Sequence, residues 1–206
     1  MIPKILCEMC DYLNAQKWKI TDSQRDGRIN SISDEDKIIE LLKKKYPIDV
    51  PPPRSWCDFS YDDGIFYPVN IKSTTGNGND NLSCKMGIYY ALTGKNPIEE
   101  QVSSIWKSYF DKLNADLSEN DVDYYFLVLN KGTGKTFMSA LKGLYSLVPN
   151  GNNLPFQCNW LENRRKGYQS RTFKEAEKFL LTKFGESIKG RIAIGDDFKA
   201  NFPDYL

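Results

Sequence analysis

Residues 56–94 read WCDFSYDDGIFYPVNIKSTTGNGNDNLSCKMGIYYALTG, and this stretch decides the fold that the sequence predicts. Two runs rich in aromatic and β-branched residues flank Asp62-Asp63-Gly64, a pattern typical of a β-hairpin with glycine in a left-handed turn position. The polar segment 73–83 is predicted as a loop and residues 84–92 as a helix. The stretch therefore predicts two paired strands, a loop and a helix in succession.

The length of the hairpin turn decides which side chains lie together. A three-residue turn at 62–64 sets Asp58 opposite Pro68. Because side chains alternate along a strand, Asp58, Asn70 and Lys72 then share one face of the hairpin. A two-residue turn would place Asp58 on the other face.

The rest of the chain supplies the other elements of an α/β fold, and residues 1–206 are expected to form one domain with a central mixed β-sheet flanked by helices. Hydrophobic periodicity, capping residues and breakers predict helices over 3–14, from Ser31 or Ser33 to Tyr46, from Pro97 to about Leu117 and over 172–188, where Thr172 forms a capping box with Glu175. The same signals predict strands over 122–130 and 154–160, a strand or short helix over 137–148, and a basic loop over 163–171. The segment GTGKT at 132–136 lacks the glycine spacing of a phosphate-binding loop and is interpreted as a hairpin turn.

Composition excludes several classes of chemistry. The chain has no histidine, which removes Ser-His-Asp and Cys-His catalysis and most catalytic zinc sites. Its net charge of +1 gives no global attraction to nucleic acid, and no apolar run approaches the ~18 residues of a membrane span. The five scattered cysteines, with Cys7 and Cys10 interpreted as plain helix residues, indicate reduced thiols and a cytoplasmic protein without a membrane segment.

Asp58, Asn70 and Lys72 form the candidate catalytic site. Phosphodiester hydrolysis needs a divalent cation that polarises a phosphoryl oxygen and activates water, with a second cation nearby. A carboxylate, an amide oxygen and a lysine on one hairpin face match these needs, and oxygen donors favour Mg²⁺. Glu35 lies on the same helical stripe as Ile38, which is expected to face inward, so Glu35 is a candidate third oxygen donor.

A helix acid, an Asp and a strand bearing (D/E)-x-K resemble the signature of the PD-(D/E)XK nucleases, and VNIKSTT at 69–75 is similar to the EcoRV-like branch of the type II restriction endonucleases. The resemblance covers residues 28–94 and implies a restriction-endonuclease-like fold. It also implies that Asp58 bridges the metal, Lys72 lies near the nucleophilic water and Glu35 is the helix acid. Asn70 departs from the pattern because it replaces a carboxylate. Either Asn is tolerated, or an acid such as Asp80 or Glu35 compensates, or the substitution is inactivating.

The resemblance implies a Mg²⁺-dependent, sequence-specific endodeoxyribonuclease that cleaves double-stranded DNA as a homodimer. Phosphate contacts are expected from the basic stretch and base contacts from amide-rich loops, because Asn and Gln pair with adenine edges. The candidate DNA-binding residues are Arg164, Arg165, Lys166, Arg171, Asn77, Asn79, Asn81, Asn150, Asn152, Asn153, Gln157 and Asn159. Three alternatives stay open: a catalytically silent DNA-binding module on the nuclease fold, a monomeric or nicking repair or defence nuclease, and an unrelated structural α/β protein.

Overall fold

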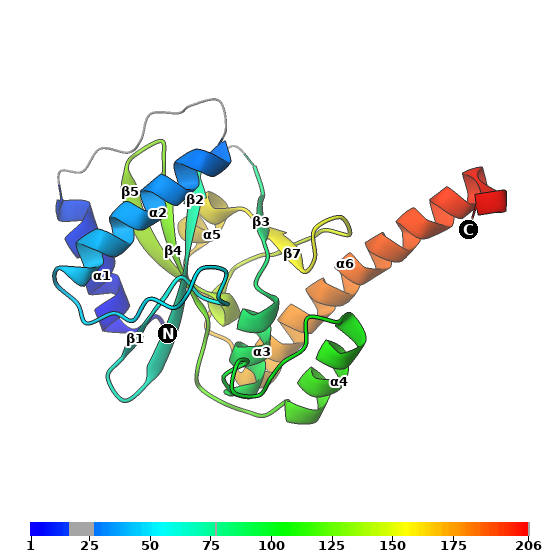
Figure 1. The fold of residues 1–206 in the computed structure, drawn as a ribbon, viewed down its shortest axis with the longest axis horizontal. Helices are drawn as coiled ribbons and strands as arrows, with labels where there is room; N and C mark the ends of the chain where they lie inside the picture. The colour runs from blue at the N-terminus through cyan, green and yellow to red at the C-terminus, as the bar shows by residue number, and fades with distance from the viewer. Residues whose placement is uncertain (17–26, 77, 206) are drawn as a thin grey trace.

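The computed structural model describes residues 1–16, 27–76 and 78–205, and it describes the side chains within these ranges except those of 27–33 and 205. Figure 1 shows a central sheet with helices on both sides and a C-terminal helix that projects away from the body. The elements are α1 (Lys4–Ala15), α2 (Gly27–Lys43), β1 (Phe59–Asp62), β2 (Phe66–Thr74), β3 (Asp80–Leu82), α3 (Lys85–Thr93), α4 (Trp106–Asp116), β4 (Tyr125–Asn130), β5 (Lys135–Ala140), η1 (Leu141–Gly143), β6 (Val148–Pro149), β7 (Phe156–Cys158), α5 (Trp160–Lys166), α6 (Phe173–Asn201) and η2 (Pro203–Tyr205).

The central sheet has the strand order β1-β2-β4-β5. β2 and β4 run parallel, whereas β1–β2 and β4–β5 are antiparallel pairs, so the predicted α/β fold with a mixed, helix-flanked sheet is confirmed. All six residues of β4 are buried, as expected for a strand covered on both faces. The GTGKT segment lies at the turn and start of β5 in the β4–β5 hairpin, which confirms the interpretation as a hairpin turn.

The β1–β2 hairpin has a turn of the predicted length but a different strand register. Asp62 pairs with Phe66 and Ser60 with Pro68, so the turn comprises residues 63–65. The predicted pairing of Asp58 with Pro68 is therefore wrong by two residues. The turn still has three residues, but the ladder ends at Phe59 and the Asp58 N–H donates to the Val69 carbonyl outside the regular register, so the shared face of Asp58, Asn70 and Lys72 stays a prediction. Gly64 adopts the left-handed conformation with φ 102°.

Two apolar clusters fill the two sides of the sheet. The first lies between the sheet and the N-terminal helices, and joins Leu6, Met9 and Leu13 of α1 and Ile38 and Leu42 of α2 to Phe59, Val69, Ile71, Leu127 and Leu129 of the strands. The second joins α3, α4, α5 and α6 to the other face, with Ile88, Tyr109, Phe126, Val128, Trp160, Leu180 and Phe184 among its members. Residues 126 and 128 of β4 thus face the second cluster, and residues 127 and 129 the first.

Several predicted boundaries are corrected by the structure. α2 begins at Gly27, so Ser31 and Ser33 lie inside the helix rather than at its N-cap. The helix predicted from Pro97 begins only at Trp106, because residues 97–101 form turns in which Gln101 has a positive φ. The strand predicted over 154–160 covers only β7, and part of the predicted basic loop is helix α5.

The C-terminal part of the chain is dominated by α6. Thr172 caps this helix, and Glu175 completes the predicted capping box, which is confirmed. The helix continues to Asn201, far beyond the predicted segment. Among the described residues, no helix is long and apolar enough to cross a membrane.

Candidate active site

Asp58 stands immediately before β1, where the hairpin ladder ends. Its backbone N–H donates to the Val69 carbonyl at 2.9 Å, and its carboxylate Oδ2 accepts the Ile71 N–H at 2.6 Å. Val69 and Ile71 belong to the cluster on the α1–α2 side of the sheet. Because side chains alternate along β2, Asn70 and Lys72 point to the opposite face. Asp58 precedes β1, and its carboxylate reaches β2 at the Ile71 N–H.

Glu35 approaches this site from α2, past the edge of β2. β1 begins only at Phe59, so among the described strands the C-terminal half of β2 has β4 as its one neighbour. The pKa of Glu35 is raised to about 7, first by burial and next by the negative charge of Asp58, while Lys72 opposes the rise. Because such electrostatic effects fall off with distance, Glu35 lies within range of the Asp58 and Lys72 charges.

Lys72 is the common neighbour of three carboxyl groups. Burial raises the pKa of Glu35, Asp58 and Asp80, and in each case the Lys72 ammonium acts in the opposite direction. Asp80 is the first residue of β3, and the Thr74 side chain also acts to lower its pKa. Within the described part of the chain Lys72 forms no direct ion pair, so its ammonium group is not held by a single carboxylate. Shifted carboxyl groups around one cation are a common mark of a functional site.

Asp34 and Lys131 form an ion pair beside these side chains, and the sequence analysis did not predict it. Asp34 is buried, and its Oδ2 lies 3.1 Å from Lys131 Nζ. The backbone N–H of Lys131 donates to the Thr74 carbonyl at 2.9 Å, and its charge also lowers the pKa of Glu35. The parallel pairing of β2 with β4 is the signal that would have found Lys131, because the ends of two parallel neighbours meet at one edge of the sheet.

The donor set of this site fits Mg²⁺. Asp58 uses one carboxylate oxygen for the Ile71 N–H, which leaves the other for a cation, and Glu35 and Asn70 offer further oxygen donors of the hard type that Mg²⁺ prefers. Among the described residues, no three Cys, Asp or Glu side chains converge into a metal-binding group, so a cation here needs the Asn70 amide or water as well. A cation would also stabilise the ionised carboxylates that burial disfavours.

Asn70 lines a cavity, unlike the other candidate catalytic residues. It lines a space of about 480 Å³ together with residues of the segment before β1, the start of α3 and the 97–102 segment. Asn70 pairs with Phe126 of β4, so the cavity lies on the face of the sheet that α3 covers. Asp58, Glu35 and Lys72 are not among the residues that line this cavity.

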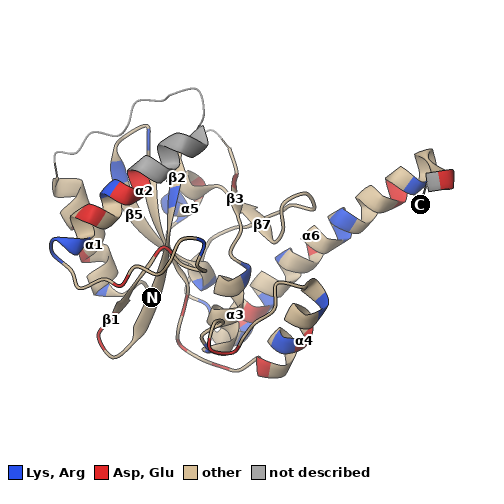
Figure 2. Ribbon diagram, in the orientation of Figure 1, with Lys and Arg blue, Asp and Glu red and all other residues tan. Residues whose placement is uncertain are grey.

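The predicted basic stretch is divided by the structure. Arg164, Arg165 and Lys166 form the exposed last turn of α5, and the side chains of two of them lie over aromatic rings, Arg164 over Phe137 at 4.7 Å and Lys166 over Tyr145 at 5.2 Å. Figure 2 shows these basic positions together on α5, whereas basic and acidic positions alternate along α6. The three side chains keep their charged groups near solvent, as phosphate binding requires.

Arg171 is held inside the fold instead. Its Nη1 donates to the carbonyls of Lys142 at 2.9 Å and Leu144 at 2.7 Å, and its guanidinium lies 4.0 Å from the Phe179 ring centroid. Burial lowers the pKa of this guanidinium. Arg171 therefore ties the segment after β5 to α6, and little of it remains for DNA.

Most of the predicted amide side chains gather around the small antiparallel sheet β3-β7-β6. The Asn81 amide oxygen accepts from Gln157 at 3.0 Å and from Asn150 at 3.4 Å. Asn150 in turn accepts the N–H groups of Asn152 at 3.0 Å and Asn153 at 3.2 Å, which shapes the 150–153 turn.

The remaining amides stand apart from this cluster. Asn79 is exposed, and Asn77 lies outside the described residues. Asn159 is the N-cap of α5 and accepts the Glu162 N–H at 2.9 Å, a structural role that sequence reasoning did not assign.

Comparison with known proteins adds no relative. No family model matches this chain, and no curated protein matches its sequence.

Proposed function

We propose that this chain is a Mg²⁺-dependent endodeoxyribonuclease of the type II restriction class, which cleaves double-stranded DNA on a restriction-endonuclease-like fold. The observation that carries the proposal is the Asp58 carboxylate bonded to the Ile71 N–H, one residue before Lys72, with the charges of Asp58 and Lys72 both acting on Glu35. Two carboxylates with raised pKa values beside one lysine form a site that favours cation binding and proton transfer.

Each residue has a role in the proposed reaction. Asp58, Asn70 and Glu35 would hold Mg²⁺, which when bound polarises a phosphoryl oxygen and makes water a better nucleophile. Lys72 orients the water and offsets negative charge that develops on the phosphate. Glu35 has a pKa of about 7 in the free protein, so part of its population carries a proton that a bound cation would displace.

Phosphate and base contacts are assigned to two surfaces. Arg164, Arg165 and Lys166 on α5 present three exposed cations that suit the DNA backbone. The amide cluster around β3-β7-β6 offers donors and acceptors for base edges. We assign the protein to the cytoplasm, a proposal supported by its five free thiols.

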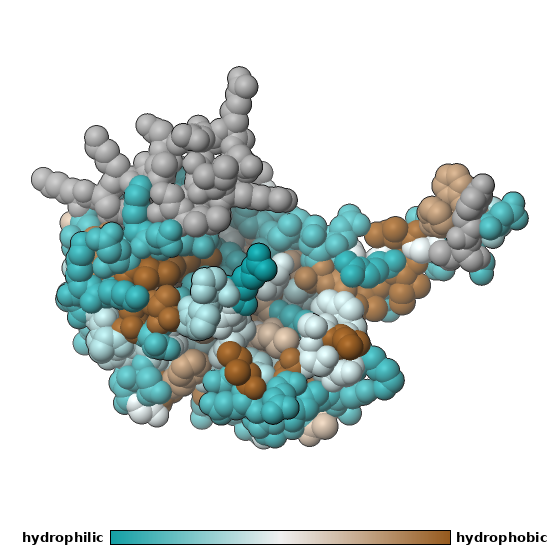
Figure 3. Space-filling view, viewed as in Figure 1, coloured by the Kyte–Doolittle hydropathy of each residue, from teal (hydrophilic) through white to brown (hydrophobic). Residues whose placement is uncertain are grey.

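Cleavage of both strands is proposed to use a homodimer that pairs through α6. The buried stripe of α6, which includes Leu180 and Phe184, continues at helical spacing into the exposed side chains Ile194, Phe198 and Phe202. Figure 3 shows hydrophobic side chains along this projecting part of the helix. Together with Ile192, these side chains expose on the order of 400 Å² of surface per copy. Contact with a second copy would bury this surface on both chains, and with the polar residues that flank the stripe the buried area approaches the ~1,200 Å² of a specific interface.

The nuclease proposal is tested by incubating mixed-sequence plasmid DNA with the protein in Mg²⁺ and in EDTA, and by sequencing the cut ends. We expect Mg²⁺-dependent cleavage that Asp58→Ala and Lys72→Ala each lower by at least 100-fold, whereas the exposed Lys178→Ala on α6 leaves it unchanged. Activity that survives EDTA or Lys72→Ala contradicts the assignment. Mass in solution for the wild type and Phe198→Lys tests the homodimer, because a charge on the stripe should give monomers.

A silent DNA-binding module is the second candidate, and the neutral Asn70 favours it. Asn70→Asp restores the carboxylate of the family pattern and should increase Mg²⁺ affinity and cleavage if the site is a nuclease site. DNA binding without cleavage by both the wild type and Asn70→Asp would assign the silent module. Nicked rather than linear product from a monomer would assign the nicking nuclease.

A further inference from the structure

The cavity beside Asn70 is built by three separate segments. Arg54 and Trp56 come from the segment before β1, Lys85 from the start of α3, and Gln101 from the segment before α4, and the space has a volume of about 480 Å³. Volumes of about 300–1,000 Å³ are typical of small-molecule sites. Its walls combine apolar and aromatic surface with two cations and two side-chain amides.

Backbone strain is concentrated at this cavity. Arg54 with φ 68° and Gln101 with φ 51° are the only non-glycine residues among those described that have a positive φ, and both line this cavity. Positive φ is unfavourable for residues with a Cβ and persists where the surroundings hold it, often at binding sites. Two such residues in the lining of one cavity indicate a site built for a ligand.

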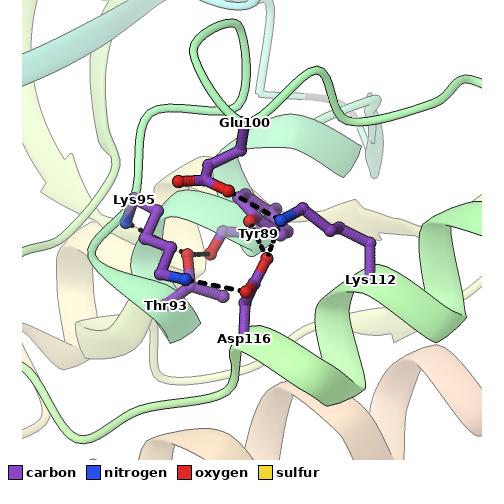
Figure 4. Close-up of polar contacts among 6 residues, drawn as sticks. All are labelled: Tyr89, Thr93, Lys95, Glu100, Lys112 and Asp116. Atoms are coloured by element: carbon purple, nitrogen blue, oxygen red, sulfur yellow. Dashed lines mark hydrogen bonds and ion pairs between the residues drawn. The ribbon is translucent and has the colours of Figure 1, made fainter.

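The Gln101 wall is held by a network of charged side chains. Figure 4 shows Glu100 paired with Lys112. The Asp116 carboxylate forms ion pairs with Lys112 and Lys95 and accepts a hydrogen bond from the Tyr89 hydroxyl. The Glu100–Lys112 contact is 2.6 Å and both lysine contacts of Asp116 are 2.7 Å. These contacts fix the strained segment against α3 and α4.

Another part of the cavity lining is aromatic. Trp56 packs with its ring centroid 5.3 Å from that of Tyr90 and 5.7 Å from that of Tyr124, and its carbonyl accepts the Tyr124 hydroxyl. The Lys85 ammonium is occupied by the Ser104 carbonyl at 2.7 Å and lies over the Trp106 ring. Arg54 is exposed and, within the described residues, pairs with no acid, so it is the cation available to a ligand.

We propose that this cavity receives one nucleotide of the DNA, turned out of the duplex next to the phosphate that is cut. The inference rests on the proposed nuclease function, because Asn70 belongs both to the candidate metal site and to the cavity wall. Extrahelical bases are recognised by stacking on aromatic or apolar side chains and by hydrogen bonds to the base edge. Trp56 supplies the stacking surface, the Asn70 and Gln101 amides supply the hydrogen bonds to the base edge, and the Arg54 guanidinium suits the phosphate.

The test compares two labelled 20-base-pair duplexes, one fully paired and one with a single unpaired adenosine, in Ca²⁺ without Mg²⁺ so that binding is measured without cutting. An unpaired base costs less to turn out, so we expect at least tenfold tighter binding of the bulged duplex and competition by dAMP. Arg54→Ala and Gln101→Gly should each remove this preference. Gln101→Gly should also raise the unfolding temperature because it relieves the strain.

The exposed Lys178→Ala is the control and should keep the preference. Equal affinities for the two duplexes, or a preference that persists in both Arg54→Ala and Gln101→Gly, would overturn the cavity assignment. Mg²⁺-dependent plasmid cleavage is measured separately, so a failed cavity with intact cleavage is distinguishable from failure of the nuclease function. A preference without cleavage by the wild type or Asn70→Asp would overturn the placement beside a cut phosphate.

Discussion

Asp123 offers a measurable link between a buried charge and folding. It lies just before β4, and its Oδ1 accepts the N–H groups of Tyr124 at 2.8 Å and Lys142 at 3.1 Å. Burial raises its pKa from 3.8 to about 6, and these hydrogen bonds only partly oppose the rise. Asp123→Asn keeps an oxygen in the Oδ1 position and removes the charge.

The sign and size follow from proton linkage. Because the folded state holds the proton more tightly than the unfolded state, the contribution of Asp123 to stability falls as the pH rises from about 4 to about 6 and is constant above. The difference between 3.8 and about 6, at ~1.4 kcal/mol per pKa unit, gives a loss of about 3 kcal/mol. Asp123→Asn should remove this loss.

The assay is urea unfolding followed by tryptophan fluorescence at pH values from 4 to 7.5, with thiols kept reduced. We expect the free energy of unfolding of Asp123→Asn, relative to wild type, to rise by up to ~3 kcal/mol between pH 4 and pH 6.5. The exposed Asp121→Asn is the matched control and should follow the wild type. A constant difference between Asp123→Asn and wild type across this range would refute the reasoning.

Three further changes test the site and the fold. Asp58→Asn should lower the pKa of Glu35 from about 7, because one negative neighbour is removed while burial remains, and carboxyl NMR titration measures it; an unchanged value would mean that the two side chains are not neighbours. Thr172→Ala removes the capping bond from the Glu175 N–H to the Thr172 hydroxyl, while the backbone N–H of residue 172 can still donate to Glu175, and it should lower the free energy of unfolding by about 1 kcal/mol in urea, with no loss expected for the exposed Lys174→Ala. Gly87→Ala would set a Cβ 2.5 Å from the Tyr124 ring, so it should destabilise the protein in thermal unfolding by ~1–3 kcal/mol, less the gain in helix propensity; a net stabilisation would show that the ring moves freely.

The hairpin shows what sequence pattern can and cannot decide. An odd number of turn residues decides which side chains of the paired strands share a face, and the predicted length of three residues is the length observed. The register depends on which three residues turn, and Gly64 fits a turn at 62–64 as well as one at 63–65. The length of the turn was therefore predictable, whereas the pairing of Asp58 was not.

Long-range geometry accounts for the other differences. Apolar spacing from Ile98 to Leu113 suggested one helix, but the segment over 97–102 turns to wall a cavity whose other side lies more than forty residues earlier, at 54–56. Asn159 and the basic residues after it looked like a polar loop, yet Asn159 caps α5. Periodicity and composition report on local structure, and neither reveals which distant segments meet.

Hydrogen exchange in the projecting part of α6 can report whether the protein is a monomer or a dimer. Arg191 ties the helix to the 150–153 turn through the carbonyls of Gly151 at 2.7 Å and Asn152 at 2.8 Å, and the residues from 192 to 201 are exposed. A helical segment this short has little stability in water without tertiary packing. Backbone amides beyond Arg191 should therefore exchange with deuterium quickly in a monomer and slowly under a partner, while amides near Leu180 stay protected in both states.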